Sequence, residues 1–383
     1  MNHPLITEKH RQWIEKVKAF AQNEVKPLVK ELDVKEKFSN ELTRRMGQLG
    51  LFGMYLPEVY GGSNTDYFSL VLVVEELAKV DSSQAATLAS QNSLGIGPIY
   101  YFGTEKQKEK YLPGLTTGDR LWAFGLTEAK AGSDSRGTES HAELINGHWH
   151  INGNKMFISN ASSELSVGIT LQVVTGLNSK GEKELSTILV DRSTPGYFTE
   201  KLQGKMMWRA TDTARMRFEN CMVPEENILG KPGKGSNIML QTLDSGRLTI
   251  AAMGLGLAEG AFELAMNYAK SREQFGKPII KFQATSFKLA DMATKIEAAR
   301  NLLYHAVWLK DHDLPFGKES AMAKLYCSEI AREVADECVQ IHGAYGLFNE
   351  YDAERFYRDQ RLLQIGEGTS EILRVIIARH IGC

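Results

Sequence analysis

This sequence has few of the features that mark export, metal binding or contact with nucleic acid. Its 383 residues include only four cysteines, and these are scattered without Cys-x-x-Cys or mixed Cys/His spacing. The pattern argues against a disulfide scaffold or a metal module and indicates free thiols in a reducing compartment. The formal net charge is −2 and no basic stripe occurs, so neither nucleic acid nor an anionic membrane surface is a favoured partner.

Signal peptides and membrane spans are not indicated either. Residues 1–30 mix acids, bases and apolar side chains at helical spacing, unlike a signal or transit peptide. The longest uncharged stretch, residues 82–104, contains amides, hydroxyls, glycines and a proline that a membrane span would hardly tolerate. We interpret this stretch as a buried helix followed by a loop, and we expect a cytoplasmic protein.

What the sequence contains is an alternation of helical and strand patterns. Residues 70–79 are apolar on nearly every helical face, and a charged helix begins at Glu105 and is interrupted by the Pro-Gly pair at 113–114. Strands and their Asn-Gly turns at 146–147 and 152–153 are predicted for residues 142–145, 148–151, 156–158, 186–190 and 218–223. Helical periodicity returns at residues 248–258, 292–309 and 322–339. We predict an α+β protein with a helical domain at 1–120, a middle β domain at 121–230 and a helical domain at 231–383.

The most informative segment is Ile-Gly-Glu-Gly-Thr-Ser-Glu at residues 365–371. Glu367 stands between two glycines, which let backbone and ligand approach closely. Thr369 or Ser370 can cap the helix that follows. A carboxylate held in this way could abstract a proton, although the same residues also suit a helix-entry turn with a solvated acid.

Over nearly its whole length, the sequence resembles the acyl-CoA dehydrogenase family. The matching segments are 124–134, 155–160, 243–247, 271–278, 340–344 and 365–371, in the order found in that family. The resemblance implies an N-terminal helical lobe, a central β barrel and a C-terminal four-helix bundle. It also implies an enzyme that converts an acyl-CoA to its trans-2-enoyl-CoA. This reaction removes a proton and a hydride, and because no side chain accepts hydride a cofactor is required. The resemblance implies FAD.

The resemblance assigns the catalytic base to Glu367, opposite flavin N5, which accepts the hydride. The backbone N–H of Glu367, together with a ribityl hydroxyl, is expected to hold the thioester carbonyl and stabilise its developing charge. Desolvation by the acyl chain and the flavin should raise the pKa of Glu367. Some relatives take the base from segment 243–247, but the matching residue here is Gly246, which has no side chain.

Residues expected to contact FAD come from several segments. Where the family often has Trp, this chain has Phe157, which keeps an aromatic face but lacks the indole N–H. His342 is expected to be a packed histidine. The expected FAD contacts are Phe124, Leu126, Thr127, Ser133, Phe157, Ser159, Arg272, Phe275, Gln283, Gln340, Gly343, Ala344, Thr369 and Glu371. The expected acyl-CoA contacts are Ser133, Asp244, Arg247 and Gly368.

The resemblance also implies partners. Arg272, Phe275 and Gln283 are expected to reach the pyrophosphate and adenosine of a neighbouring subunit's flavin, which implies a homotetramer. Electrons are expected to pass to an electron-transfer flavoprotein. Ala85 stands where relatives that take dicarboxylic acyl groups have arginine, and Gly366 stands where many have tyrosine, which favours a short, branched or cyclic acyl group. An alternative substrate is an acyl group carried on an acyl or peptidyl carrier protein. A catalytically dead binding protein is disfavoured by Glu367, Arg272 and Thr369.

Overall fold

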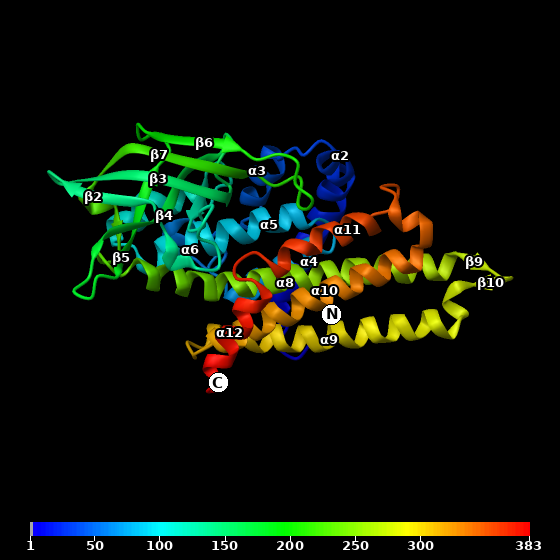
Figure 1. Ribbon diagram of the computed structural model, residues 1–383. Helices are drawn as coiled ribbons and strands as arrows, with labels where there is room; N and C mark the ends of the chain where they lie inside the picture. The colour runs from blue at the N-terminus through cyan, green and yellow to red at the C-terminus, as the bar shows by residue number, and fades with distance from the viewer. Residues whose placement is uncertain (1–2) are drawn as a thin grey trace.

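In the computed structural model, which describes residues 3–383, helical regions precede and follow a β sheet along the chain (Figure 1). Side-chain caps fix several helix starts in the first region: Thr7 and Thr104 form capping boxes, and Asp66 and Asp81 accept from backbone N–H groups of the helices that follow them. The elements of this region are α1 (Glu8–Phe20), η1 (Ala21–Val25), η2 (Lys26–Leu28), α2 (Val29–Val34), α3 (Asn40–Gln48), η3 (Glu58–Tyr60), α4 (Tyr67–Ala78), α5 (Ser82–Ser90), η4 (Gln91–Ile96), α6 (Gly97–Phe102) and α7 (Glu105–Leu115).

Two details of the first region differ from the sequence interpretation. The loop predicted within residues 82–104 is wrong, because α5, η4 and α6 are helical from Ser82 to Phe102. Two of its amides are satisfied inside the protein: Asn92 Nδ2 donates to Leu51 O at 2.9 Å, and Gln91 Nε2 donates to Leu115 O at 3.0 Å. The buried side-chain amide of Gln84 has no hydrogen-bond partner within residues 3–383. Helix α7 also continues past Pro113 to Leu115, so the predicted interruption there is wrong.

The middle of the chain forms a sheet in the strand order β6-β7-β3-β2-β4-β5-β8, with β1 paired in parallel to β4. The Asn-Gly turn at 146–147 joins β2 and β3 as predicted, and both its residues have positive φ. The predicted turn at 152–153 is wrong, because β3 continues through it with a shift in register at Gly153. The strands are β1 (Leu121–Gly125), β2 (His141–Ile145), β3 (His148–Ser159), β4 (Ser166–Leu177), β5 (Lys183–Asp191), β6 (Tyr197–Lys201), β7 (Thr213–Pro224) and β8 (Ile228–Leu229), with short helices η5 (Ser135–Gly137) and η6 (Glu225–Asn227).

Long helices α8, α9 and α10 make up the bundle of the last region, and the β9–β10 hairpin lies at the end of the bundle remote from the sheet (Figure 1). Helix α8 is long and apolar enough to cross a membrane by composition alone. However, 83% of its most apolar 18-residue window is buried inside the fold, as in the core helix of a soluble protein. The elements are α8 (Gly235–Ser271), β9 (Glu273–Gln274), β10 (Lys277–Pro278), η7 (Ile279–Lys281), α9 (Gln283–Asp311), α10 (Gly317–His342), η8 (Gly343–Leu347), α11 (Ala353–Asp359), η9 (Gln360–Gln364) and α12 (Ser370–His380).

The predicted α+β class, with helices before and after the strands, is confirmed. One apolar core joins the N-terminal helices to the C-terminal bundle, while a second core fills the sheet. All four cysteines are free, and only Cys383 is exposed. His342 is packed as expected, since its ring stacks on Tyr268 with centroids 4.2 Å apart.

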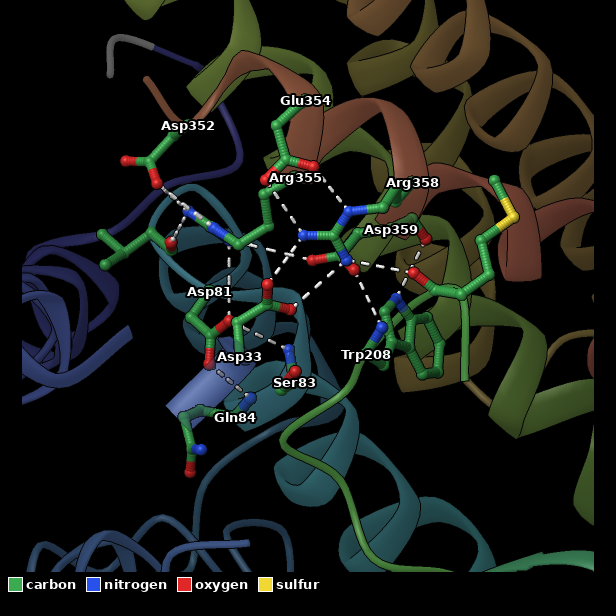
Figure 2. Close-up of polar contacts among 12 residues, drawn as sticks. Asp33, Asp81, Ser83, Gln84, Trp208, Asp352, Glu354, Arg355, Arg358 and Asp359 are labelled. Carbon is green, nitrogen blue, oxygen red and sulfur yellow. Dashed lines mark hydrogen bonds and ion pairs between the residues drawn. The ribbon is translucent and has the colours of Figure 1, made fainter. Parts of the chain in front are cut away.

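A buried ion-pair cluster ties α11 to the rest of the protein (Figure 2). We call it the arginine cluster and define it as Asp33, Asp81, Arg355, Arg358 and Asp359. Arg358 Nη2 lies 2.7 Å from Asp33 Oδ2, and Arg355 Nη1 lies 3.6 Å from Asp81 Oδ1 and 3.8 Å from Asp359 Oδ2. The backbone N–H of Trp208, from the sheet region, donates to Asp359 Oδ1 at 2.8 Å. The cluster therefore fixes α11, which is separated from residues 365–371 only by η9.

Candidate active site

Glu367 lies on a short elbow between η9 and α12. Its φ is 53° and that of Gly368 is 104°, so two consecutive residues have left-handed backbone. This conformation is costly for a glutamate and is accessible to glycine. Thr369 then caps α12 by accepting from Ile372 N at 3.2 Å, which is the cap expected from the sequence. We call Glu367 and Gly368 the elbow. The elbow and the Thr369 cap together hold the Glu367 side chain at a defined place over the bundle.

Gly246 of α8 forms the floor under the Glu367 carboxyl group. A Cβ atom added at Gly246 would collide with Glu367 Oε2 and would lie 3.3 Å from Leu94 Cδ2. The two positions from which the family resemblance draws a base are therefore adjacent in space. Only one of them can carry a side chain in this geometry, and here that residue is Glu367.

The Glu367 carboxylate and its own backbone amide both have unused hydrogen-bonding capacity. Glu367 Oε2 is buried and has no hydrogen-bond partner within residues 3–383. The Glu367 N–H likewise donates to no acceptor in this part of the chain. Buried polar groups in proteins are normally satisfied, so an unpaired acceptor beside an unpaired donor marks a place prepared for a ligand.

Burial raises the pKa of Glu367 to about 7, while the positive charges of Lys324 and Arg247 act in the opposite direction. A carboxyl group with a pKa in this range is ionised to a useful extent at neutral pH and still binds a proton well. That combination suits a general base.

Two cations approach the elbow through its backbone rather than through its carboxylate. Lys324 Nζ, on α10, donates to Gly368 O at 2.7 Å, and Arg247 Nε, on α8, donates to Glu367 O at 3.4 Å. Arg247 also pairs with Asp244, whose Oδ1 lies 2.5 Å from its Nη1. The Asp244 carboxylate is partly exposed, whereas Arg247 is buried.

Lys324 was not identified from the sequence. Its relative exposure is 0%, although lysine is almost never fully buried without a partner. A signal was present, because Lys324 shares a helix face with Ala321, Cys327 and Ala331, all of which are buried. A lysine on an otherwise apolar helix face is unusual, and this pattern would have identified Lys324 as a candidate site residue.

A second group of predicted site residues lies on the sheet. Met156 N donates to Thr127 O at 2.9 Å, which places the segment after β1 beside the end of β3. Phe157 in β3 has a positive φ of 61° and is 66% exposed. Where these two segments meet, a place that we call the sheet edge, Phe124, Leu126, Thr127 and Ser159 are partly exposed, and Ser133 is exposed.

A third group lies at the far end of the bundle. Phe275, in the β9–β10 hairpin, is 94% exposed, and the Arg272 guanidinium lies 5.7 Å from the ring centroid of Tyr345. Gln283, Gln340, Gly343 and Ala344 are exposed in the same part of the structure, whereas Glu371 is exposed beside the elbow at the start of α12. A single chain thus does not bring this group together with the sheet group, because the hairpin and the sheet occupy opposite ends (Figure 1).

Comparison with known proteins gives a consistent result. Models of the N-terminal, middle and C-terminal domains of acyl-CoA dehydrogenase match residues 7–119, 123–221 and 233–382. A probable acyl-CoA dehydrogenase of Bacillus subtilis is 45% identical and is aligned over 98% of both chains. The butyryl-CoA dehydrogenase structure from Megasphaera elsdenii has a TM-score of 0.96 at 40% identity, with full coverage of both chains. A chain from a structure reported as the electron transferring flavoprotein of Acidaminococcus fermentans also gives 0.96, at 41% identity and full coverage.

Proposed function

This chain belongs to the acyl-CoA dehydrogenase family, and from that premise we propose that it desaturates a short acyl-CoA with Glu367 as the base. The observation that carries the proposal is the unpaired Oε2 of Glu367, held on a strained elbow beside its own unpaired N–H. The enzyme is an acyl-CoA dehydrogenase that uses FAD, as its family does.

The residues at the sheet edge fit FAD. An aromatic ring that is 66% exposed at Phe157 offers a flat apolar face, and Thr127 and Ser159, which carry hydroxyls, are partly exposed. A planar ring system with a polar rim matches this combination. FAD, when bound, supplies the hydride acceptor that the side chains lack.

Glu367 would remove the proton from the α carbon of the substrate. As the proton leaves, negative charge moves onto the thioester oxygen, where the free N–H of Glu367 can donate a hydrogen bond. The proton is taken up by Oε2, which has no competing partner within residues 3–383. Gly246 leaves the space that this carboxylate occupies.

A short acyl group is supported by the residues near the acyl end. Helix α5 carries no cation, and Ala85 within it is fully buried, so a second carboxylate on the acyl group would have no counter-charge there. Gly366 leaves room beside the elbow, since a Cβ at this position would have only ordinary contacts with Leu362 at 3.6 Å. The similarity to butyryl-CoA dehydrogenase points the same way.

Electron-transfer flavoprotein as electron acceptor and a homotetrameric assembly are further parts of this proposal. The first is supported by similarity to a chain from the Acidaminococcus structure. For the second, the β9–β10 hairpin, which carries Phe275, lies remote from the sheet (Figure 1), so a second copy is needed to bring both groups to one flavin. This supports a shared subunit interface within the proposed tetramer.

The test is anaerobic titration of the purified flavoprotein with a panel of thioesters. Butyryl-CoA is expected to bleach the flavin and yield crotonyl-CoA, whereas octanoyl-CoA and glutaryl-CoA react more slowly. Butyryl groups on a carrier protein form a separate arm. If only the carrier-bound thioester bleached the flavin, the substrate would be a carrier-bound acyl group and not an acyl-CoA. If no thioester bleached it, the proposed reaction would be overturned.

A further inference from the structure

A buried lysine lies directly beneath the Glu367 elbow. Lys324 is 0% exposed, and its Nζ donates to the carbonyl of Gly368 at 2.7 Å. We propose that Lys324 is the positioning residue of this site: its ammonium group holds the elbow through the Gly368 carbonyl and keeps the Glu367 carboxylate ionised without pairing with it. The inference rests on the proposed role of Glu367 as base.

The elbow needs an external hold because its backbone is unfavourable. Glu367 has φ of 53°, and a non-glycine residue keeps such a conformation only where its surroundings impose it. Lys324 and Arg247 supply two of those contacts, one on each of the two carbonyls of the elbow. They come from α10 and α8, which are the helices that carry the elbow.

The geometry also separates charge neutralisation from ion pairing. Neither Lys324 nor Arg247 forms an ion pair with the Glu367 carboxylate within 4.0 Å, although both act on it electrostatically. A direct contact would stabilise the anion strongly and would occupy the oxygen that must receive the proton. Placing the positive charge against the backbone preserves both the anion and its free lone pair.

The charges that face Lys324 determine the sign of its effect. They are Glu367, Arg247, Glu329 and Glu371. Burial lowers the pKa of Lys324 to about 7, and the Glu367 anion opposes that change. Lysine and glutamate therefore support each other's charged form, so removal of the lysine should raise the pKa of Glu367.

A merely structural role would give a different result. A buried lysine that only binds a carbonyl contributes to stability, and its loss would leave the ionisation of Glu367 unchanged. Lys205 offers a matched control, because its Nζ donates to Trp208 O at 3.0 Å and to Thr211 O at 2.7 Å, away from the elbow. Burial also lowers the pKa of Lys205, to about 8.

The experiment compares Lys324→Met, Lys324→Gln, Lys324→Arg and Lys205→Met as purified flavoproteins. The carboxyl band of Glu367 is identified by infrared difference against Glu367→Gln and titrated without substrate, and the pH profile of kcat/KM is measured in parallel. We expect Lys324→Met to raise the Glu367 midpoint by about one pH unit or more. Lys324→Gln, which keeps a donor but no charge, should do the same. In Lys324→Arg the Glu367 midpoint should stay near the wild-type value. Lys205→Met should lower Tm and leave the Glu367 midpoint unchanged.

An unchanged midpoint in Lys324→Gln or Lys324→Met would overturn the inference, and the glutamine variant decides the question if the methionine variant does not fold. An equal shift in Lys205→Met would also overturn it. Failure of the proposed function is distinguishable, because Glu367→Gln would then retain near-normal turnover whatever the Lys324 variants show.

Discussion

The arginine cluster and the Glu367 site both involve residues of the C-terminal region, but they differ in whether the buried carboxylate has a positively charged partner. Within residues 3–383, four buried carboxylate oxygens lack a hydrogen bond: those of Glu75, Glu259, Asp359 and Glu367. The first three lie within 4.0 Å of an arginine or lysine nitrogen, including Asp359 at 3.8 Å from Arg355. Only Glu367 Oε2 has neither kind of partner in this part of the chain.

This difference separates a structural acid from a reactive one better than proton affinity does. Burial raises the pKa of Asp359 to about 7, the same value as for Glu367. Asp359, however, is 1% exposed and accepts from Trp208, while Glu367 is only half-buried. A perturbed pKa marks both sites, and an oxygen with neither a hydrogen-bond partner nor an ion-pair partner within residues 3–383 marks one of them.

The largest effect should come from Glu367→Gln, which keeps shape and burial but removes the proposed base. We expect kcat with butyryl-CoA to fall about 10²–10⁴-fold, because a positioned general base contributes on that order. Flavin content should stay close to wild type, and Tm at neutral pH should not fall below the wild-type value. Rapid-mixing kinetics of flavin bleaching measure the loss, and turnover within a few fold of wild type would contradict the assignment.

On the other side of the comparison, Arg355→Met should cost stability rather than chemistry. It leaves Asp81, Asp352 and Asp359 without the shared guanidinium, and removal of one partner from a buried ion pair costs about 3–5 kcal/mol. Denaturant unfolding measures the loss. The pH midpoint of kcat/KM should not move in the folded fraction. An Arg355→Met variant as stable as wild type would show that the arginine cluster does not stabilise the fold.

Sequence reasoning reached the fold class and the Glu367 elbow because both depend on local signals. Glycines flank Glu367, Thr369 caps a helix, and Asn146-Gly147 makes a turn, each through its own backbone preference. The failures depend on distant partners. Asn92, inside the helical segment, donates to the carbonyl of Leu51, and buried Lys324 donates a hydrogen bond to the carbonyl of Gly368, 44 residues away. The roles assigned to the remaining site residues stay predictions.

Two glycines of α8 sharpen the comparison further. At Gly246 an added methyl group meets the movable end of Glu367, whereas at Gly256 it meets the backbone carbonyl of Glu75. We expect Gly246→Ala to lower kcat up to about 10²-fold by displacing the base, with little change in Tm. Gly256→Ala should lower Tm with smaller kinetic consequences. Parallel activity and thermal unfolding measurements test the pair, and identical behaviour of both variants would remove the distinction.

The pH dependence should follow Glu367. With its pKa raised to about 7, the base is protonated below that pH, so kcat/KM should fall about tenfold per pH unit in acid and level off above 7. Because the pKa of Glu367 is higher in the folded protein than its ordinary value of 4.5, protonation of this group contributes to the free energy of unfolding. The contribution is fully present below pH 4.5 and is lost as the pH rises through about 7. Glu367→Gln should therefore gain Tm relative to wild type as pH rises across that window. A flat kcat/KM profile from pH 5 to 8 would contradict the assignment.

The smallest expected effect tests whether the far end of the bundle belongs to the same site. Arg272 lies apart from the sheet edge, and its exposed guanidinium fits a phosphate group held by another copy of the chain. Arg272→Ala should weaken FAD retention about tenfold, in line with the loss of one charge-assisted contact of about 1.5 kcal/mol. Arg215→Ala, which removes a surface pair with Glu200 on the sheet, serves as the control. Flavin-to-protein ratio after gel filtration measures the effect. Equal ratios in both variants would confine the flavin contacts to the Glu367 side and the sheet.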